Sequence, residues 1–154
     1  MLDKSKFKFK TQVRVRNYEI DWQGVVHNAN YLLYFEVGRA AYLEHVGVKI
    51  DVNSIQHESK VVVVRNEIDY RSAARFDDLL DVYTRISYIR NTSFAFEGII
   101  EHAVRKAPIA ENISFHVWLD HRNNRPMQVP HEFRSVIQKF EGNNALITVP
   151  ATLV

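Results

Sequence analysis

The sequence predicts an α+β fold in which a five-stranded antiparallel sheet wraps around one long central helix, with a short helix near the C-terminus. Three observations carry this prediction. One early segment alternates apolar and polar residues, one segment is apolar nearly all round at helical spacing, and four strand-like segments follow one another closely. With 154 residues, the chain is expected to form a single domain, 1–154, with its core at about 7–142.

Residues 6–16 form the first expected strand, because apolar residues and Thr11 at the odd positions alternate with basic residues and Gln12 at the even positions. The basic side is interpreted as a solvated strand face or a guarded sheet edge. The next element is a helix of about 16 residues, 30–45, which should end near Gly47. Since this segment is apolar nearly all round, we expect the helix to be nearly enclosed.

Four further strands are expected to begin at Val61, Leu79, Ser93 and Ile109, because each segment alternates and is rich in β-branched or aromatic residues. Short turns between them favour antiparallel hairpins, so the second half is predicted to be a meander. Behind Pro130, apolar residues at helical spacing predict the C-terminal helix. The last dozen residues either add an edge strand or trail off.

The composition narrows the class of protein. A formal net charge of +2 with scattered basic residues gives no basic arm or patch for nucleic acid. The chain contains no cysteine, which fits a reducing compartment, and we expect a cytoplasmic location. No segment reaches the roughly 18 apolar residues of a membrane helix. The sequence also lacks a GxSxG, phosphate-loop or HExxH motif, and its histidines lack metal-ligand spacing, so no metal is expected.

Residues 18–39, YEIDWQGVVHNANYLLYFEVGR, hold the candidate chemistry. Asp21 stands before Gly24, which permits a tight turn, and a helix starts within a few residues. If the strand continued that far, Glu19 would share a face with Asp21. Because the first N–H groups of a helix are unpaired, Asp21 and the amide of Asn28 could flank one carbonyl. This arrangement suits acyl transfer from a reactive ester to water.

The stretch DWQGVVHNANYLLYFEVGR resembles the motif of the hotdog-fold acyl-CoA thioesterases of the 4-hydroxybenzoyl-CoA thioesterase type, and the resemblance resumes at IDYRSAARFDDLLDVYTRI. It implies that Asp21 is the catalytic carboxylate, acting as nucleophile or general base. The backbone N–H of Asn28 would polarise the thioester carbonyl. Many relatives carry Tyr-His or a similar pair where this chain has His27-Asn28, so two interpretations of His27 stay open: it orients a water or the thioester, or it packs at the loop.

The resemblance also implies a substrate-binding set near the turn and near the coenzyme A phosphates, made up of Gly24, Val25, Arg90, Thr92 and Ser93. The substrate would be an acyl-CoA, and no cofactor is implied beyond the coenzyme A of that substrate. A single sheet around one helix leaves a face free, so we expect a homodimer and leave further pairing into a tetramer open.

Other interpretations remain beside this one. An acyl-carrier-protein thioesterase would use the same chemistry, and a dehydratase of the same fold lacks its histidine pattern here. A non-catalytic acyl-CoA binding module is the alternative of another class. Glu36 and Arg39 are interpreted as an intrahelical or interface ion pair, Asp77 and Asp78 as turn residues, and the helix aromatics as core.

Overall fold

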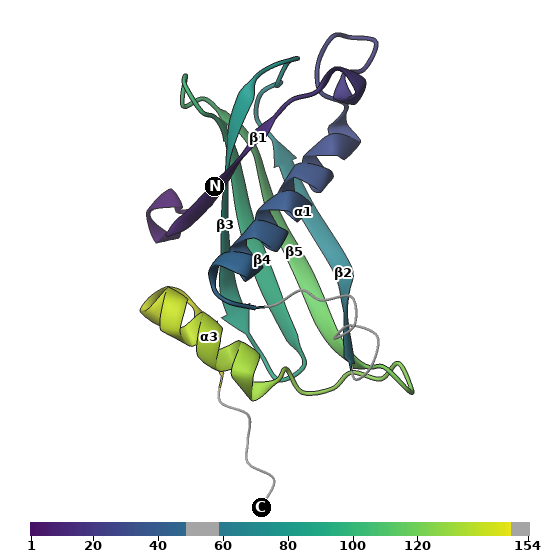
Figure 1. Ribbon diagram of the computed structural model, residues 1–154, viewed down its shortest axis with the longest axis vertical. Helices are drawn as coiled ribbons and strands as arrows, with labels where there is room; N and C mark the ends of the chain where they lie inside the picture. Colours follow the sequence, from purple (N-terminus) through teal and green to yellow (C-terminus); the bar gives the residue numbers. More distant parts are fainter. Residues whose placement is uncertain (49–58, 149–154) are drawn as a thin grey trace, which may run out of the picture. The chain divides into compact units, whose positions relative to one another are not determined.

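The computed structural model describes residues 1–48 and 59–148. Its elements, in chain order, are η1 (Lys4–Lys6), β1 (Phe9–Arg14), η2 (Asn17–Glu19), α1 (Asn28–His45), β2 (Ser59–Tyr70), β3 (Leu79–Ile89), β4 (Ser93–His102), β5 (Pro108–Asp120), α3 (His131–Glu141), η3 (Gly142–Asn144) and β6 (Leu146–Ile147). The predicted α+β class with one long helix and a short C-terminal helix is therefore confirmed (Figure 1). No helix within the described ranges is long and apolar enough to cross a lipid bilayer.

The strands form one sheet in the order β1-β3-β4-β5-β2. β1 pairs antiparallel with the first part of β3, from Phe9 opposite Thr84 to Arg14 opposite Leu79. The predicted meander holds for β3, β4 and β5, but it is wrong for β2, which lies beside β5. Local patterning identifies a strand without identifying its neighbour, and the connection from Arg71 to Asp78 carries the chain to β3.

For the last dozen residues, two outcomes were expected: an additional edge strand or an unpaired tail. A short sixth strand, β6, is present. β6 contains two residues and pairs parallel with β3, with Leu146 opposite Tyr88 and Ile147 opposite Ile89. Residues 149–154 lie outside the described residues. The first strand is also shorter than expected, since η1 occupies Lys4–Lys6 and the strand begins only at Phe9.

By internal contacts the chain divides into two compact units. The first comprises Met1–Tyr42, Glu67–Arg85 and Glu97–Ile113, and the second comprises Leu43–Asn66, Ile86–Phe96 and Ser114–Val154. The expectation of one domain over residues 1–154 stays a prediction.

In the first unit, α1 packs on the sheet through one of its sides. A Cβ atom added at Gly38 would lie 2.6 Å from Thr84 Oγ1 on β3, and one added at Gly98 on β4 would lie 2.6 Å from the Phe35 ring. The absence of side chains at these two glycines lets helix and strands approach closely. The opposite side of α1 is exposed, with Leu33 61% and Val37 47% accessible, so the expectation of a nearly enclosed helix is wrong for the single chain.

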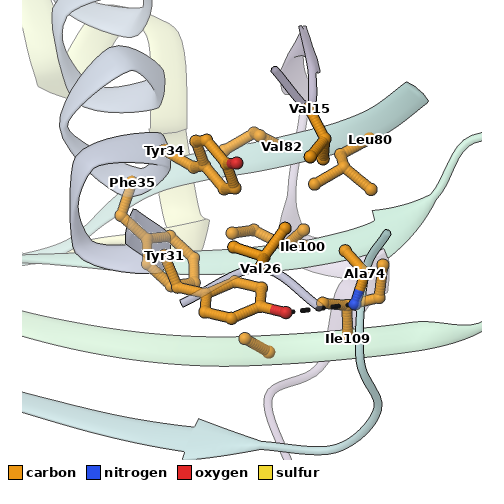
Figure 2. Packing of buried hydrophobic residues seen from close by; sticks show 11 residues of the cluster. Val15, Val26, Tyr31, Tyr34, Phe35, Ala74, Leu80, Val82, Ile100 and Ile109 are labelled. Carbon is orange, nitrogen blue, oxygen red and sulfur yellow. Dashed lines mark hydrogen bonds between the residues drawn. The ribbon is translucent and has the colours of Figure 1, made fainter. Parts of the chain in front are cut away.

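The core of the first unit contains the helix aromatics, as expected. Tyr31, Tyr34 and Phe35 pack against aliphatic residues of the sheet and of the loops around it (Figure 2). The Ala74 N–H donates a hydrogen bond to the Tyr31 hydroxyl over 3.1 Å, which ties the connection between β2 and β3 to the helix. Burial raises the pKa of Tyr31, so its hydroxyl stays neutral.

A buried arginine organises the second unit. The Arg134 guanidinium on α3 donates to the carbonyl oxygens of Val129 and Thr148, each over 3.0 Å, and to those of Arg90 and Asn91 in the turn between β3 and β4. Arg134 is 6% exposed, and burial lowers the pKa of its guanidinium. Phe133, the preceding residue, packs against Phe94 in a tilted arrangement and edge-on against Trp118, with ring centroids 5.1 Å away in each case.

Candidate functional site

Asp21 sits at the entrance of a tight turn that is closed by backbone hydrogen bonds. The Asp21 N–H donates to the Val25 carbonyl over 2.9 Å, and the Gly24 N–H donates to the Asp21 carbonyl over 3.0 Å. Gly24 has a φ of 77°, which a residue with a side chain adopts only at a cost. The Asp21 carboxylate accepts the Gln23 N–H over 2.8 Å through Oδ1. One carboxylate oxygen thus fixes the turn, and among residues 1–48 and 59–148 no hydrogen-bond partner engages Oδ2 of this half-buried side chain.

Glu19 does not share a site with Asp21, because β1 ends at Arg14 and Glu19 lies in the 3-10 turn η2. Its carboxylate accepts hydrogen bonds from the Tyr34 hydroxyl and from the Arg16 N–H, each over 2.7 Å. Burial and the hydrogen bond with Glu19 raise the pKa of Tyr34, which keeps its hydroxyl protonated as a donor. The conditional expectation that Glu19 and Asp21 lie on one face is therefore wrong, and Glu19 is a structural residue.

The helix α1 begins at Asn28, two residues earlier than expected. The preceding residue, His27, occupies the N-cap position, and its ring Nδ1 accepts the Ala29 N–H over 3.2 Å. Within residues 1–48 and 59–148, the Asn28 N–H has no hydrogen-bond acceptor. This donor stands at the end of a helix, where the aligned peptide dipoles favour negative charge.

Asp21, His27 and Asn28 all line one open depression of about 510 Å³. Its other lining residues come from the Asp21 turn, from the buried face of α1 and from the chain after β2: Trp22, Gln23, Val25, Val26, Tyr31, Tyr70, Arg71, Ser72 and Ala73. The wall thus combines one carboxylate, one unpaired helix-end N–H and several apolar or aromatic surfaces. Such a mixture is typical of a binding site for a small molecule.

Only Asp21, Val25, His27 and Asn28 of this wall were predicted as site residues, and Tyr70 and Arg71 are among the unpredicted ones that lie far from them in the sequence. Tyr70 is the last residue of β2, is 49% exposed, and donates its hydroxyl hydrogen to the Asn28 carbonyl over 3.2 Å. The Arg71 guanidinium pairs with Glu111 at 3.2 Å and with Asp69 at 3.5 Å. Both follow the Asp21 turn by about 50 residues, and only the folded chain brings them to it.

The remaining predicted site residues separate into two groups. Val25 lines the depression, while Gly24 forms the turn without lining it. Arg90, Thr92 and Ser93 belong to the second unit and do not line the depression. They form the turn between β3 and β4, in which the Arg90 N–H donates to the Ser93 carbonyl over 2.7 Å, and the Arg90 guanidinium lies 4.9 Å from the centre of the Tyr88 ring.

The charged residues that the sequence analysis interpreted as structural lie in an intrahelical ion pair and in a turn. Arg39 pairs with Glu36 within α1. Asp77 adopts a positive φ of 66°, and Asp78 accepts the Arg75 N–H over 2.9 Å, so both are turn residues as predicted.

Comparison with known proteins gives one family description. A model of the thioesterase-like superfamily matches residues 15–137. The chain is 29% identical over 134 residues to the acyl-CoA thioester hydrolase YbgC of Escherichia coli O157:H7, which covers 86% of this chain and 96% of that protein. It is 31% identical over 131 residues to the acyl-acyl carrier protein thioesterase ATL3, chloroplastic, of Arabidopsis thaliana, covering 85% of this chain and 68% of that one.

Solved structures agree with this description. A thioesterase from Thermus thermophilus, solved in complex with coenzyme A and Zn, superposes with a TM-score of 0.76 at 28% identity and covers 89% of this chain and 96% of its own. The DHNA-CoA thioesterase from Staphylococcus aureus reaches a TM-score of 0.80 at 15% identity, covering 91% of this chain and 97% of its own, and shows the similarity of the fold alone.

Proposed function

Because the chain belongs to the thioesterase-like superfamily and is a thioester hydrolase of the hotdog fold, we propose that it hydrolyses an acyl-coenzyme A to a carboxylic acid and coenzyme A. The relatives named as acyl-CoA thioesterases and the structural neighbour that contains coenzyme A support this substrate. The family membership sets aside the non-catalytic binding module.

One observation carries the proposal at the level of atoms. Asp21 and Asn28 line the same depression, and the Asn28 N–H has no acceptor in the described part of the chain. A thioester carbonyl bound between them would meet a base or nucleophile on one side and a hydrogen-bond donor on the other. The start of α1 adds the positive end of its dipole where the oxygen becomes negative.

The proposed reaction uses only groups of the protein, the substrate and water. In the general-base route, Asp21 removes a proton from water as the water oxygen attacks the carbonyl carbon, and the Asn28 N–H stabilises the resulting oxyanion. Collapse of the intermediate breaks the carbon–sulfur bond, and the thiolate takes up a proton. In the nucleophilic route, the Asp21 carboxylate attacks the carbonyl carbon, the carbon–sulfur bond breaks and the coenzyme A thiolate leaves and takes up a proton, and water then hydrolyses the resulting mixed anhydride to the carboxylic acid and free Asp21. No cofactor is proposed.

An acyl-carrier-protein substrate is the less favoured alternative. The Arabidopsis relatives named for that activity match over 68% of their length, whereas the YbgC proteins of Escherichia coli and Shigella flexneri match over 96% of theirs. Comparison of acyl-CoA with the same acyl group on a carrier protein separates the two substrates. A thiol-release assay over acyl-CoA esters of graded chain length and of aromatic acids tests the proposed function, and an absence of release with every ester would reject it.

We propose further that the protein acts as a homodimer, in the cytoplasm. The exposed Leu33 and Val37 lie one turn apart on the free side of α1, where a second copy could cover them. Light scattering at micromolar concentration should give twice the mass of one chain, and Leu33→Asp should shift the protein toward the monomer. A monomeric wild type with full activity would reject the dimer.

A further inference from the structure

The first turn of α1 is held by hydrogen bonds on nearly all of its polar groups. The His27 N–H and the Asn30 side-chain amide both donate to the Glu19 carbonyl, over 2.9 and 2.8 Å. The Asn30 N–H donates to the His27 carbonyl over 2.9 Å. One N–H of this turn, that of Asn28, is left for the depression.

Two side chains complete this arrangement. The His27 ring accepts the Ala29 N–H, and the Tyr70 hydroxyl donates to the Asn28 carbonyl. Both bonds hold the peptide group between Asn28 and Ala29, next to the unpaired Asn28 N–H. Tyr70 is itself well fixed: the next N–H, of Arg71, donates to the Ile109 carbonyl over 2.8 Å, and its ring packs edge-on against Tyr31 at 5.6 Å.

Resting on the proposed function, we infer that His27 and Tyr70 are positioning residues for the Asn28 N–H and that His27 transfers no proton in the reaction. An imidazole whose Nδ1 accepts an N–H carries its proton on Nε2. If His27 served as an acid, its cationic form would place an Nδ1 proton against the Ala29 N–H and a positive charge at a helix N-terminus. If it served as a base through Nε2, the ring would first have to move its proton to Nδ1. Either role breaks the cap.

Substitutions at position 27 separate capping from proton transfer. Asn and Asp cap helices about equally well and differ in charge, and asparagine has no titratable group that could replace an imidazole as a proton carrier. His27→Ala should lower kcat about five- to tenfold with KM within about twofold, because the interaction belongs to the transition state. His27→Asn should keep at least about a third of the wild-type kcat. His121→Ala, an exposed histidine of the β5–α3 connection, is the matched control.

The aspartate variant distinguishes positioning from a purely structural cap. His27→Asp retains the acceptor for Ala29 but sets a negative charge beside the developing oxyanion, so its kcat should fall at least about tenfold below that of His27→Asn. A residue that only stabilised the fold would give Asp and Asn variants of equal kcat. That result would overturn the inference, as would an asparagine variant no faster than the alanine variant.

Tyr70 is tested together with His27. If both side chains hold the same residue, Tyr70→Phe should reduce kcat about threefold in the wild type and clearly less in the His27→Ala background, because the turn is already loosened there. Tyr18→Phe, which removes the hydroxyl of a tyrosine that is 72% exposed, is the control for the same chemical change. Losses that multiply independently would overturn the shared role.

The cap can also be measured without turnover. Hydrogen exchange of the Ala29 amide should become at least about threefold faster in His27→Ala and stay slow in both the Asn and the Asp variants. An unchanged rate in the alanine variant would overturn the inference even if the enzyme were active on no acyl-CoA ester. A wild type without thioesterase activity but with this exchange pattern would instead reject the proposed function and leave the cap established.

Discussion

The Tyr34 hydroxyl on α1 donates a hydrogen bond to the Glu19 carboxylate over 2.7 Å. Glu19 also offers its backbone carbonyl to the His27 N–H and to the Asn30 side chain. Glu19 lies just before the Asp21 turn and His27 just after it. Glu19 therefore ties the start of this turn to α1, through Tyr34 and Asn30, and to its end, through His27.

Tyr34→Phe removes the hydroxyl and leaves the Glu19 carboxylate with one donor fewer. Since a hydrogen bond to a charged group contributes about 1.5–3 kcal/mol, we expect the free energy of unfolding in urea to fall by about 1.5 kcal/mol. Tyr18→Phe, an exposed tyrosine that accepts a hydrogen bond from Arg16, should change it by less than about 0.5 kcal/mol. Equal effects of the two substitutions would contradict the role of Glu19 as an anchor.

Asp21→Asn should reduce kcat by about 10² to 10⁴, because it removes the base or nucleophile. The asparagine Oδ1 can still accept the Gln23 N–H, so the turn and the fold should be retained, which circular dichroism and urea unfolding would check. Asp77→Asn makes the same change in another turn and should leave kcat unaffected. Turnover of Asp21→Asn within about tenfold of wild type would rule out the assigned role.

Stability should fall in acid because of Asp81. Burial alone would raise the pKa of this carboxyl, but hydrogen bonds from Gln12, Lys10 and Lys106, over 2.8, 2.9 and 3.0 Å, outweigh it and lower the pKa to about 2. A depressed pKa in the folded state stabilises the protein above the unfolded value of 3.8, and this contribution is lost as the pH falls toward 2.

The measurement compares wild type with Asp81→Asn by urea unfolding. The difference in unfolding free energy should be about 2 kcal/mol at pH 7 and should shrink steadily between about pH 4 and pH 2. A difference that does not depend on pH would show that packing, and not charge, makes Asp81 important.

Gly38→Ala should destabilise the protein although alanine favours helices by about 1 kcal/mol over glycine. The added methyl group would lie 2.6 Å from Thr84 Oγ1 and 2.7 Å from Val82 Cγ1, so helix and strand must separate. We expect a net loss of about 1–3 kcal/mol in thermal or urea unfolding. Val82→Ala should make Gly38→Ala less harmful than it is alone. A stabilised single variant would mean that the strand yields at no cost.

Arg90→Ala should raise KM about fivefold and leave kcat nearly unchanged, if the exposed guanidinium contacts a coenzyme A phosphate. The corresponding loss is about 1 kcal/mol and should shrink with added salt. An acyl-pantetheine substrate without the nucleotide is the control. A similar loss with that substrate would assign Arg90 to the shape of the turn, where it lies over Tyr88.

Much of the fold could be predicted because each element carries its own periodicity. β3, β4 and β5 begin within one residue of the expected positions, and α3 follows Pro130 directly. The neighbour of β2 could not be predicted, since alternation within 59–70 is the same whichever strand lies beside it. The start of α1 at Asn28 could not be predicted, because the residue at the cap position, His27, is not one of the common capping residues.

The site residues likewise fall into a group that the sequence can predict and a group that it cannot. Asp21 and Asn28 lie seven residues apart, so a local motif can contain both. Tyr70 and Arg71 reach the same depression from the end of a strand, and Tyr34 meets Glu19 from the second turn of a helix. These contacts depend on tertiary structure, and no spacing in the sequence marks them.

The carbonyls that Arg134 binds come from three separate stretches of chain: the turn between β3 and β4, the residue preceding Pro130, and Thr148 after β6. A fluctuation that released any one of them would leave a buried cation short of acceptors, so the three stretches are expected to open together or not at all. Thr148 and the hairpin turn are consequently expected to become accessible to proteases together, because each supplies part of the acceptor set of Arg134.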